Sequence, residues 1–174
     1  KIPEPMTGTV LIAFGANLGD PIRTLQMAYQ ELAQLWTPVA ASSVYRSAPV
    51  GGVEQADFFN ALAAFATEDS GSEILNTLHR IENVHARTRE VRWGPRTLDL
   101  DVIALWEDAE PVISTDSVLT LPHPRAWERV FVTVPWQELK LSGQLGELPG
   151  FGPVNELRST NEEITCLEIG LSSS

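Results

Sequence analysis

The chain has 174 residues, of which 43% are hydrophobic and 20% are charged, and this balance excludes a disordered or low-complexity protein. Its length fits one domain that buries a core without covalent staples. With one cysteine, Cys166, an intramolecular disulfide scaffold is excluded and a reducing cytoplasm is indicated. No apolar run approaches the ~20 residues of a membrane span, so no membrane association is expected.

The net charge of −11 argues against a general nucleic-acid binder, which would be basic. The positive charge is unevenly distributed, because seven of the 12 Lys and Arg residues are arginines between Arg80 and Arg129. The planar fork of donors on arginine suits phosphate oxygens. This concentration predicts a local anion site in an acidic protein.

Six short apolar or β-branched runs are typical of strands. They cover residues 9–14, 39–45, 58–66, 98–105, 111–113 and 130–134. One helix is expected to begin with Asp20 as its N-cap and Pro21 as its first residue. A second helix is expected after Ser70 and Glu73, which are spaced as a capping box.

The order strand, helix, strand, strand, helix, strand predicts an α+β fold. Its ferredoxin-like βαββαβ core would carry extra strands and helices, with an antiparallel sheet flanked by helices. Residues 1–8 are interpreted as an N-terminal extension or linker remnant, 9–170 as a single domain and 171–174 as a frayed tail. The polar stretch over 86–97 predicts a surface loop rich in arginine.

Asp99 and Asp101 lie two residues apart on a predicted strand, so their side chains share one face. Adjacent carboxylates repel each other unless a cation lies between them, and Mg²⁺ prefers such ligands together with substrate phosphates. A merely solvated strand face is the alternative, and it is the usual one for an isolated Asp-x-Asp. The arginines of the preceding loop favour a site for a metal-bound polyphosphate.

A second polar group surrounds His123, which lies between two prolines and can donate a hydrogen bond to phosphate. The alternative is a turn histidine bonded to the backbone. Arg125 and Arg129 are spaced to share one helical turn, although Glu128 beside them also allows a plain surface salt bridge.

Further candidates are less specific. His79 and Glu82 share one helix face, which is either a polar wall for a nucleotide or an exposed surface. Trp93, in a polar loop, either stacks on a flat ligand or anchors the loop. Asn60 interrupts an apolar strand, where its amide needs partners and can read the edge of a heterocycle.

Together these segments resemble the 6-hydroxymethyl-7,8-dihydropterin pyrophosphokinase family over about residues 9–139. The most specific part is the string RWGPRTLDLD at 92–101, and the other parts occur in the same order. They are residues 15–19, 43–49, 57–61, 81–82, 87–89, 122–125 and 129–131.

The resemblance implies an ATP-dependent transferase of folate biosynthesis. It would move pyrophosphate from MgATP to the hydroxymethyl group of the reduced pterin and release AMP. Two Mg²⁺ ions would be bound by Asp99 and Asp101, and ATP would be the co-substrate. The implied protein is cytoplasmic, binds only these small molecules, and is a monomer or a domain of a fused folate-pathway enzyme.

The resemblance also implies three sets of site residues. The catalytic set is Arg87, Arg89, Arg92, Asp99 and Asp101. The ATP-binding set is His79, Glu82, Arg89, Trp93, Arg96, Thr120, His123 and Arg129. The pterin-binding set is Ser47, Ala48, Val50, Phe58, Asn60, Trp93 and Phe131, with Phe58, Asn60 and Phe131 on predicted strands.

Two other functions compete with this one. A palm-like nucleotidyl transferase or cyclase also carries carboxylates on a ferredoxin-like sheet, but it has no evident use for the Trp93 loop or for Asn60. A catalytically silent ATP- or pterin-binding module would not need two metal ligands. AMP production distinguishes all three, because a cyclase releases pyrophosphate and a binder releases nothing.

Overall fold

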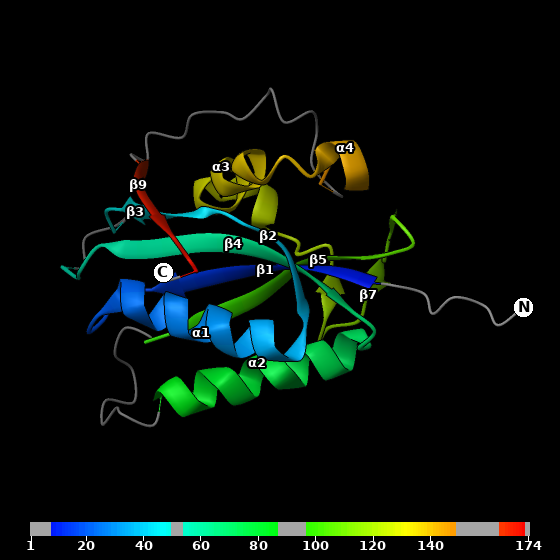
Figure 1. Cartoon of the computed structure of the whole chain (residues 1–174), viewed down its shortest axis with the longest axis horizontal. Helices are drawn as coiled ribbons and strands as arrows, with labels where there is room; N and C mark the ends of the chain where they lie inside the picture. Colours follow the sequence, from blue (N-terminus) through cyan, green and yellow to red (C-terminus); the bar gives the residue numbers. More distant parts are fainter. Residues whose placement is uncertain (1–7, 50–53, 87–96, 149–163, 173–174) are drawn as a thin grey trace, which may run out of the picture.

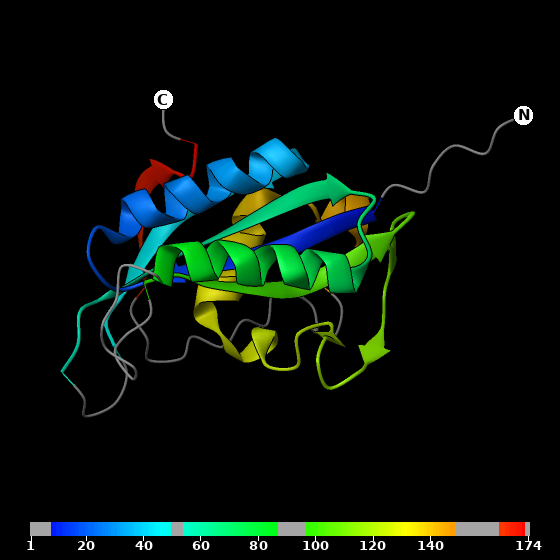
Figure 2. The same ribbon diagram turned by 90° about the horizontal axis from the view of Figure 1, so that it is seen from below.

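The computed structural model describes residues 8–49, 54–86, 97–148 and 164–172. A seven-stranded sheet lies between α1 and α2 on one face and α3 and α4 on the other (Figure 1). Seen from below, α1 and α2 lie side by side in front of the strands (Figure 2). The elements are β1 (Gly8–Ala16), α1 (Pro21–Leu35), β2 (Thr37–Ala41), β3 (Ser43–Ser47), β4 (Phe58–Thr67), α2 (Gly71–Ala86), β5 (Asp99–Glu107), β6 (Glu110–Pro111), β7 (Ser114–Thr115), β8 (Thr120–Leu121), the short 3₁₀ helix η1 (Ala126–Glu128), α3 (Val130–Leu139), α4 (Ser142–Leu145) and β9 (Ile164–Gly170).

The sheet order is β6-β5-β1-β4-β3-β9, and β2 also pairs with β4. All of these neighbours are antiparallel. Two helical crossovers, α1 and α2, place β4 and β5 on either side of β1. The expected ferredoxin-like α+β fold, with an antiparallel sheet flanked by helices, is confirmed. Within the described residues, no helix is both long and apolar enough to cross a bilayer.

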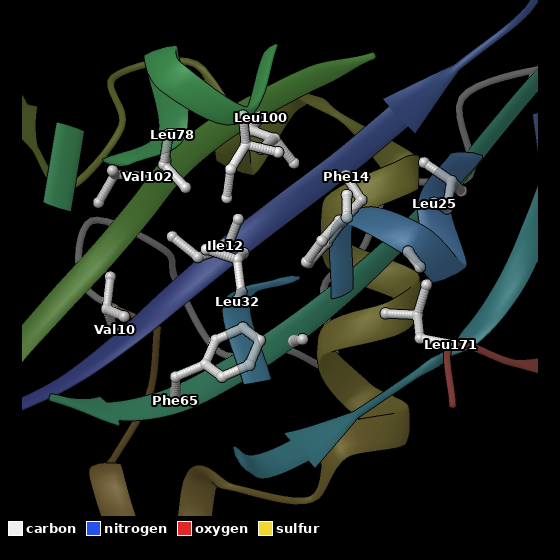
Figure 3. Packing of buried hydrophobic residues seen from close by; sticks show 14 of the residues in the cluster. Val10, Ile12, Phe14, Leu25, Leu32, Phe65, Leu78, Leu100, Val102 and Leu171 are labelled. Atoms are coloured by element: carbon white, nitrogen blue, oxygen red, sulfur yellow. The ribbon is translucent and has the colours of Figure 1, made fainter. Parts of the chain in front are cut away.

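Side chains of β1 alternate between two apolar layers, as period-2 alternation requires. Val10, Ile12 and Phe14 pack with α1 and α2, whereas Leu11 and Ala13 pack under α3. Figure 3 shows the first layer. The central strand is therefore apolar on both faces, which is typical of a strand covered on both sides.

The single strand expected over 39–45 is wrong, because the structure divides it into β2 and β3 at Ser42. The Ser42 hydroxyl donates to the Ser43 carbonyl at 2.8 Å and accepts from the Leu62 amide at 2.9 Å. This side chain, 1% exposed, inserts its own hydrogen bonds into the strand ladder and breaks it.

The strand expected over 130–134 is also wrong, because these residues begin the helix α3. Phe131, which the sequence predicts on a strand, therefore lies on a helix. Val132, Trp136 and Leu139 recur at helical spacing and are buried against the sheet. Tertiary packing thus overrides the strand preference of the β-branched residues. The strand expected over 111–113 is only partly right, since β6 and β7 lie on either side of Val112 and Ile113.

The expected segment boundaries also shift. Gly8 pairs with Thr67 of β4 and Glu107 of β5, so it belongs to the sheet rather than to an extension. Leu171, assigned to a frayed tail, is fully buried in the cluster that contains Leu25 (Figure 3). The division into one domain stays a prediction.

A single carboxylate joins α3 to β3. Glu138 accepts from the Tyr45 hydroxyl at 2.6 Å and from the Ser43 amide at 2.7 Å. Burial, and then the hydrogen bond and charge of Glu138, raise the pKa of Tyr45 above its usual value. Tyr45 therefore stays neutral at physiological pH, and its hydroxyl donates a hydrogen bond to the carboxylate.

Candidate active site

A cavity of about 320 Å³ opens beside β5, between α2 and the segment from 118 to 124. Leu75, Val118 and Leu119 also line this cavity, although they were not predicted as site residues. No motif marked them, because apolar residues on a helix or beside a short strand usually indicate core. The cavity brings together six of the predicted site residues. They are His79, Glu82, Asp99, Asp101, Thr120 and His123.

Asp99 and Asp101 lie at the beginning of β5, where they pair with Gly15 and Ala13 of β1, respectively. The intervening Leu100 is buried in the core layer of α1 and α2. The two carboxylates therefore share the other side of the strand, as their spacing predicted. Asp101 is 37% exposed and accessible to a ligand.

Glu82 brings a third carboxylate from α2. Its Oε2 accepts from the Leu100 backbone amide at 3.2 Å. Burial raises the pKa of Glu82 to about 7; the bond from Leu100 opposes this shift, and the negative charges of Asp99 and Asp101 add to it. Three carboxylates crowded into one cavity oppose ionisation, and a bound cation relieves that repulsion.

These oxygen donors fit Mg²⁺, which usually takes one or two protein carboxylates and completes its shell with water and phosphate. Within the ranges that the structure describes, no group of three or more His, Cys, Asp or Glu side chains is arranged to bind a metal by itself. Asp99 and Asp101 would thus bind Mg²⁺ together with oxygen atoms of a substrate.

His123 is attached to β5 through its backbone amide, which donates to the Ile103 carbonyl at 2.8 Å. Its ring Nδ1 accepts from the Arg125 amide at 3.2 Å. With Nδ1 as acceptor, the proton of the neutral ring resides on Nε2. His123 is therefore both a turn histidine bonded to the backbone and a neutral donor at the cavity wall.

Arg129 reaches Asp101 with an Nη1–Oδ2 distance of 3.8 Å. Its guanidinium carbon also lies 5.6 Å from the centre of the Phe131 ring. This arginine therefore connects the carboxylates to the start of α3. Arg125 differs, because its Nε lies 3.5 Å from Glu128 in an exposed pair, in agreement with the plain salt-bridge interpretation.

Four of the predicted pterin residues, Ser47, Ala48, Phe58 and Asn60, lie at the same end of the sheet on or beside β3 and β4, whereas Phe131 lies on α3. Ser47 pairs with Phe58 across the two strands, and the exposed Ala48 follows. Asn60 pairs with Gly15 of β1 and directs its Nδ2 toward the Phe14 carbonyl at 3.4 Å. One strand, β1, thus separates this group from Asp99.

Asn17 was not among the predicted site residues, although it follows β1 at the same end of the sheet. It is 2% exposed, and its Nδ2 donates to Gln55 at 3.1 Å. This bond attaches the end of β1 to the segment that enters β4. The remaining predicted residues lie outside the described ranges, and their roles stay predictions. They are Val50, Arg87, Arg89, Arg92, Trp93 and Arg96.

The titration of His123 has a testable consequence. Burial lowers the pKa of His123 below its usual 6.5; the Asp101 charge raises it and the Arg129 charge lowers it. The unfolded chain then binds more protons than the folded chain just below pH 6.5, so this residue reduces stability on acidification. Between about pH 7 and 5.5, we expect His123→Gln to lose less unfolding free energy than the wild type. Urea unfolding at each pH measures the unfolding free energy of both proteins. The same dependence of that free energy on pH in the two proteins would contradict the prediction.

An α+β fold that presents paired aspartates and a neutral histidine at one cavity, with an arginine beside one aspartate, is typical of enzymes that act on phosphate groups with the help of a metal ion. The sequence is more specific. The family 7,8-dihydro-6-hydroxymethylpterin-pyrophosphokinase (HPPK) matches residues 11–141, and the chain belongs to this family.

Similar proteins include two named 2-amino-4-hydroxy-6-hydroxymethyldihydropteridine pyrophosphokinase. The one from Haemophilus influenzae is 41% identical over 133 residues, covering 75% of this chain and 81% of the relative. The one from Bacillus subtilis is 40% identical over 136 residues, covering 77% and 79%. The bifunctional protein FolKE of Lactococcus lactis is 36% identical over 133 residues, which are 37% of its length.

Solved structures support the fold. A Plasmodium falciparum HPPK-DHPS variant with pteroate superposes with a TM-score of 0.56 at 11% identity. The wild-type protein with pterin and p-hydroxybenzoate gives 0.52 at 11% identity. Both alignments cover 89% of this chain but 43% of the solved chain, so this chain spans less than half of those proteins. Proteins named for two activities therefore occur both among the similar sequences and among the solved structures.

Proposed function

We propose that this chain transfers the β,γ-pyrophosphoryl group of ATP to the hydroxymethyl oxygen of 6-hydroxymethyl-7,8-dihydropterin and releases AMP. The observation that carries this proposal is the cavity in which Asp99 and Asp101 face His123, with Arg129 beside Asp101. Membership of the family supports the choice of substrates. We further propose two Mg²⁺ ions, a cytoplasmic location, and a monomer or a domain of a fused folate-pathway enzyme.

The proposed chemistry needs positioning and charge neutralisation more than covalent participation by the protein. The hydroxymethyl oxygen attacks the β-phosphorus, and the bond from that phosphorus to the oxygen shared with the α-phosphate breaks. AMP leaves with the electron pair. Bound Mg²⁺ would neutralise phosphate charge and make the hydroxyl more acidic. Asp99 is the candidate acceptor for the proton that the hydroxyl loses.

The remaining residues have distinct proposed roles. His123 Nε2 and the Arg129 guanidinium donate to phosphate oxygens, which carry the charge that develops during transfer. Thr120 and His79 would line the nucleotide on the cavity wall. Asn60 would bind the polar edge of the pterin, and Phe131 would pack against its ring.

Gly15 separates the two substrate groups. It pairs with Asn60 on one side and Asp99 on the other, so the three residues share one face of the sheet. Adjacent strands lie about 4.8 Å apart, so the backbones of Asn60 and Asp99 are about 10 Å apart. A Cβ atom on Gly15 would lie 2.9 Å from Asn60 Nδ2. In the proposed arrangement, the absence of a side chain at Gly15 would keep the space between the pterin and the metal open.

Gly15→Ala is expected to displace the Asn60 amide and raise the KM for the pterin about tenfold, the effect of losing one good hydrogen bond. Nucleotide affinity should not change, because the atom that the added Cβ meets within 4 Å is Asn60 Nδ2 and not an atom of a cavity residue. Steady-state kinetics with each substrate varied in turn checks this. Gly143→Ala is the control, since among the described residues no atom beyond its chain neighbours and its own helix backbone lies within 4 Å of the added Cβ. Equal losses for ATP and pterin would show that Gly15→Ala acts through the whole fold.

Incubation with ATP, Mg²⁺ and 6-hydroxymethyl-7,8-dihydropterin tests the proposed function. We expect AMP, measured by chromatography, only when the pterin is present, with one pyrophosphorylated pterin formed for each AMP. Release of pyrophosphate without the pterin would favour a cyclase or nucleotidyl transferase. Binding of both ligands without turnover would identify a silent module.

A further inference from the structure

β5 has an open edge where the two aspartates lie. Along Asp99–Glu107 it pairs with β1 on one side, but on the other side β6 pairs only with Trp106 and Glu107. Among the described residues, the first part of this outer edge thus has no neighbouring strand. Backbone N–H and C=O groups on the unpaired edge of a strand need hydrogen-bond partners other than a neighbouring strand.

Hydrogen bonds from three separate segments take the place of a neighbouring strand along this edge. The Leu105 carbonyl accepts from the Val112 amide at 2.8 Å, and the Ile103 carbonyl accepts from the His123 amide at 2.8 Å. At Leu100 the partner is a side chain, because the amide donates to Glu82 Oε2 at 3.2 Å. Of these contacts, the one from Glu82 lies nearest the aspartates, and Leu100 is the residue between them.

We infer that Glu82 is a positioning residue, whose carboxylate substitutes for a strand at Leu100 and thereby holds Asp99 and Asp101 in the arrangement that binds a cation. This inference rests on the proposed function for the identity of that cation. The bond to the Leu100 amide fixes the peptide plane between Asp99 and Leu100. Asp99 is attached directly to that plane, and Asp101 follows it through the backbone of Leu100. Groups that orient metal ligands typically change metal affinity by 10–100-fold when they are removed.

This role differs from the nucleotide contact that the resemblance implied for Glu82. A nucleotide contact requires the carboxylate to face the ligand and predicts weaker nucleotide binding in every variant. A positioning role requires only an acceptor for the Leu100 amide. An amide oxygen meets that requirement, whereas a thioether of similar length does not.

The variants Glu82→Gln and Glu82→Met separate these roles in the full chain. Mn²⁺ serves as the probe, measured by electron paramagnetic resonance with and without α,β-methylene-ATP. We expect Glu82→Met to weaken Mn²⁺ binding at least tenfold and Glu82→Gln to weaken it less than about fivefold. Affinity for the analogue without metal should stay within about twofold in both variants. Asn83→Ala, on the exposed part of the same helix, is the matched control.

Hydrogen exchange at the Leu100 amide provides a readout that needs neither metal nor turnover. We expect protection in the wild type and in Glu82→Gln, and at least tenfold faster exchange in Glu82→Met. Unchanged protection, or unchanged Mn²⁺ affinity, in a folded Glu82→Met protein would overturn the inference. If Glu82→Met does not fold, rapid exchange of Leu100 in wild type and Glu82→Gln overturns it as well.

The outcomes also separate this inference from the proposed function. A wild-type chain that forms AMP while Glu82→Met binds Mn²⁺ normally overturns the positioning role alone. A chain that forms no AMP, while Glu82→Met loses Mn²⁺ affinity and Leu100 protection, overturns the proposed transfer alone.

Discussion

Asp101→Asn is expected to lower kcat at saturating ATP and pterin by about 10³-fold, because a metal ion contributes several kcal/mol to the transition state of phosphoryl transfer. The substitution keeps the shape of the side chain and removes the charge that attracts the cation. It also removes the charged partner of Arg129, at 3.8 Å. AMP formation over a range of Mg²⁺ concentrations measures the loss and shows whether excess metal restores turnover.

Asp108→Asn is the matched control for this experiment. Asp108 is exposed in the turn after β5 and has a φ of 50°, a conformation that asparagine also tolerates. It should retain wild-type turnover. Nearly normal turnover of both Asp99→Asn and Asp101→Asn would remove the basis for metal binding at β5 and, with it, the proposed mechanism.

Phe65→Ala is expected to destabilise the fold by about 3–5 kcal/mol, the usual cost of removing a buried phenylalanine. Phe65 is fully buried on β4. Its ring centre lies 5.6 Å from that of Tyr29 and 5.7 Å from that of Trp36, so it joins α1 to the sheet. Urea unfolding measures the change in free energy.

Val84→Ala, on the surface of α2, provides the comparison for Phe65→Ala. Val84 is 52% exposed, and its truncation should change stability by less than about 0.5 kcal/mol. A loss below about 1 kcal/mol for Phe65→Ala would mean that the cavity left by the ring collapses, and that this layer packs less rigidly than its burial indicates.

Local patterns in the sequence predicted the features that depend only on residues close together in the chain. That Asp99 and Asp101 share one face follows from strand alternation alone. The break at Ser42 did not, because it depends on a bond from Leu62, twenty residues away in the chain. The helix at Phe131 was missed because five β-branched and aromatic residues indicate a strand when they are considered without the sheet that they cover.

In the site, too, local features were predicted and contacts between distant residues were not. Glu82 was identified from its helix position, but its partner Leu100 is separated from it by 18 residues, so no spacing rule connects the two. The burial of Leu171 similarly depends on a strand that returns to the sheet from the end of the chain. Interactions between distant segments were therefore what the sequence could not reveal.

The Glu138 carboxylate joins α3, which carries Phe131, to β3, which ends at Ser47. These two elements would form opposite walls of the pterin site. Because both oxygens of one side chain hold them, the distance between the walls is set when the protein folds. If the pterin binds there as we propose, a flat ring would enter a space of fixed width, and little conformational entropy would be lost on binding. The same rigidity would discriminate against bulkier ring systems. The hydrogen bonds of Glu138 would therefore contribute to substrate selection without direct contact with the substrate.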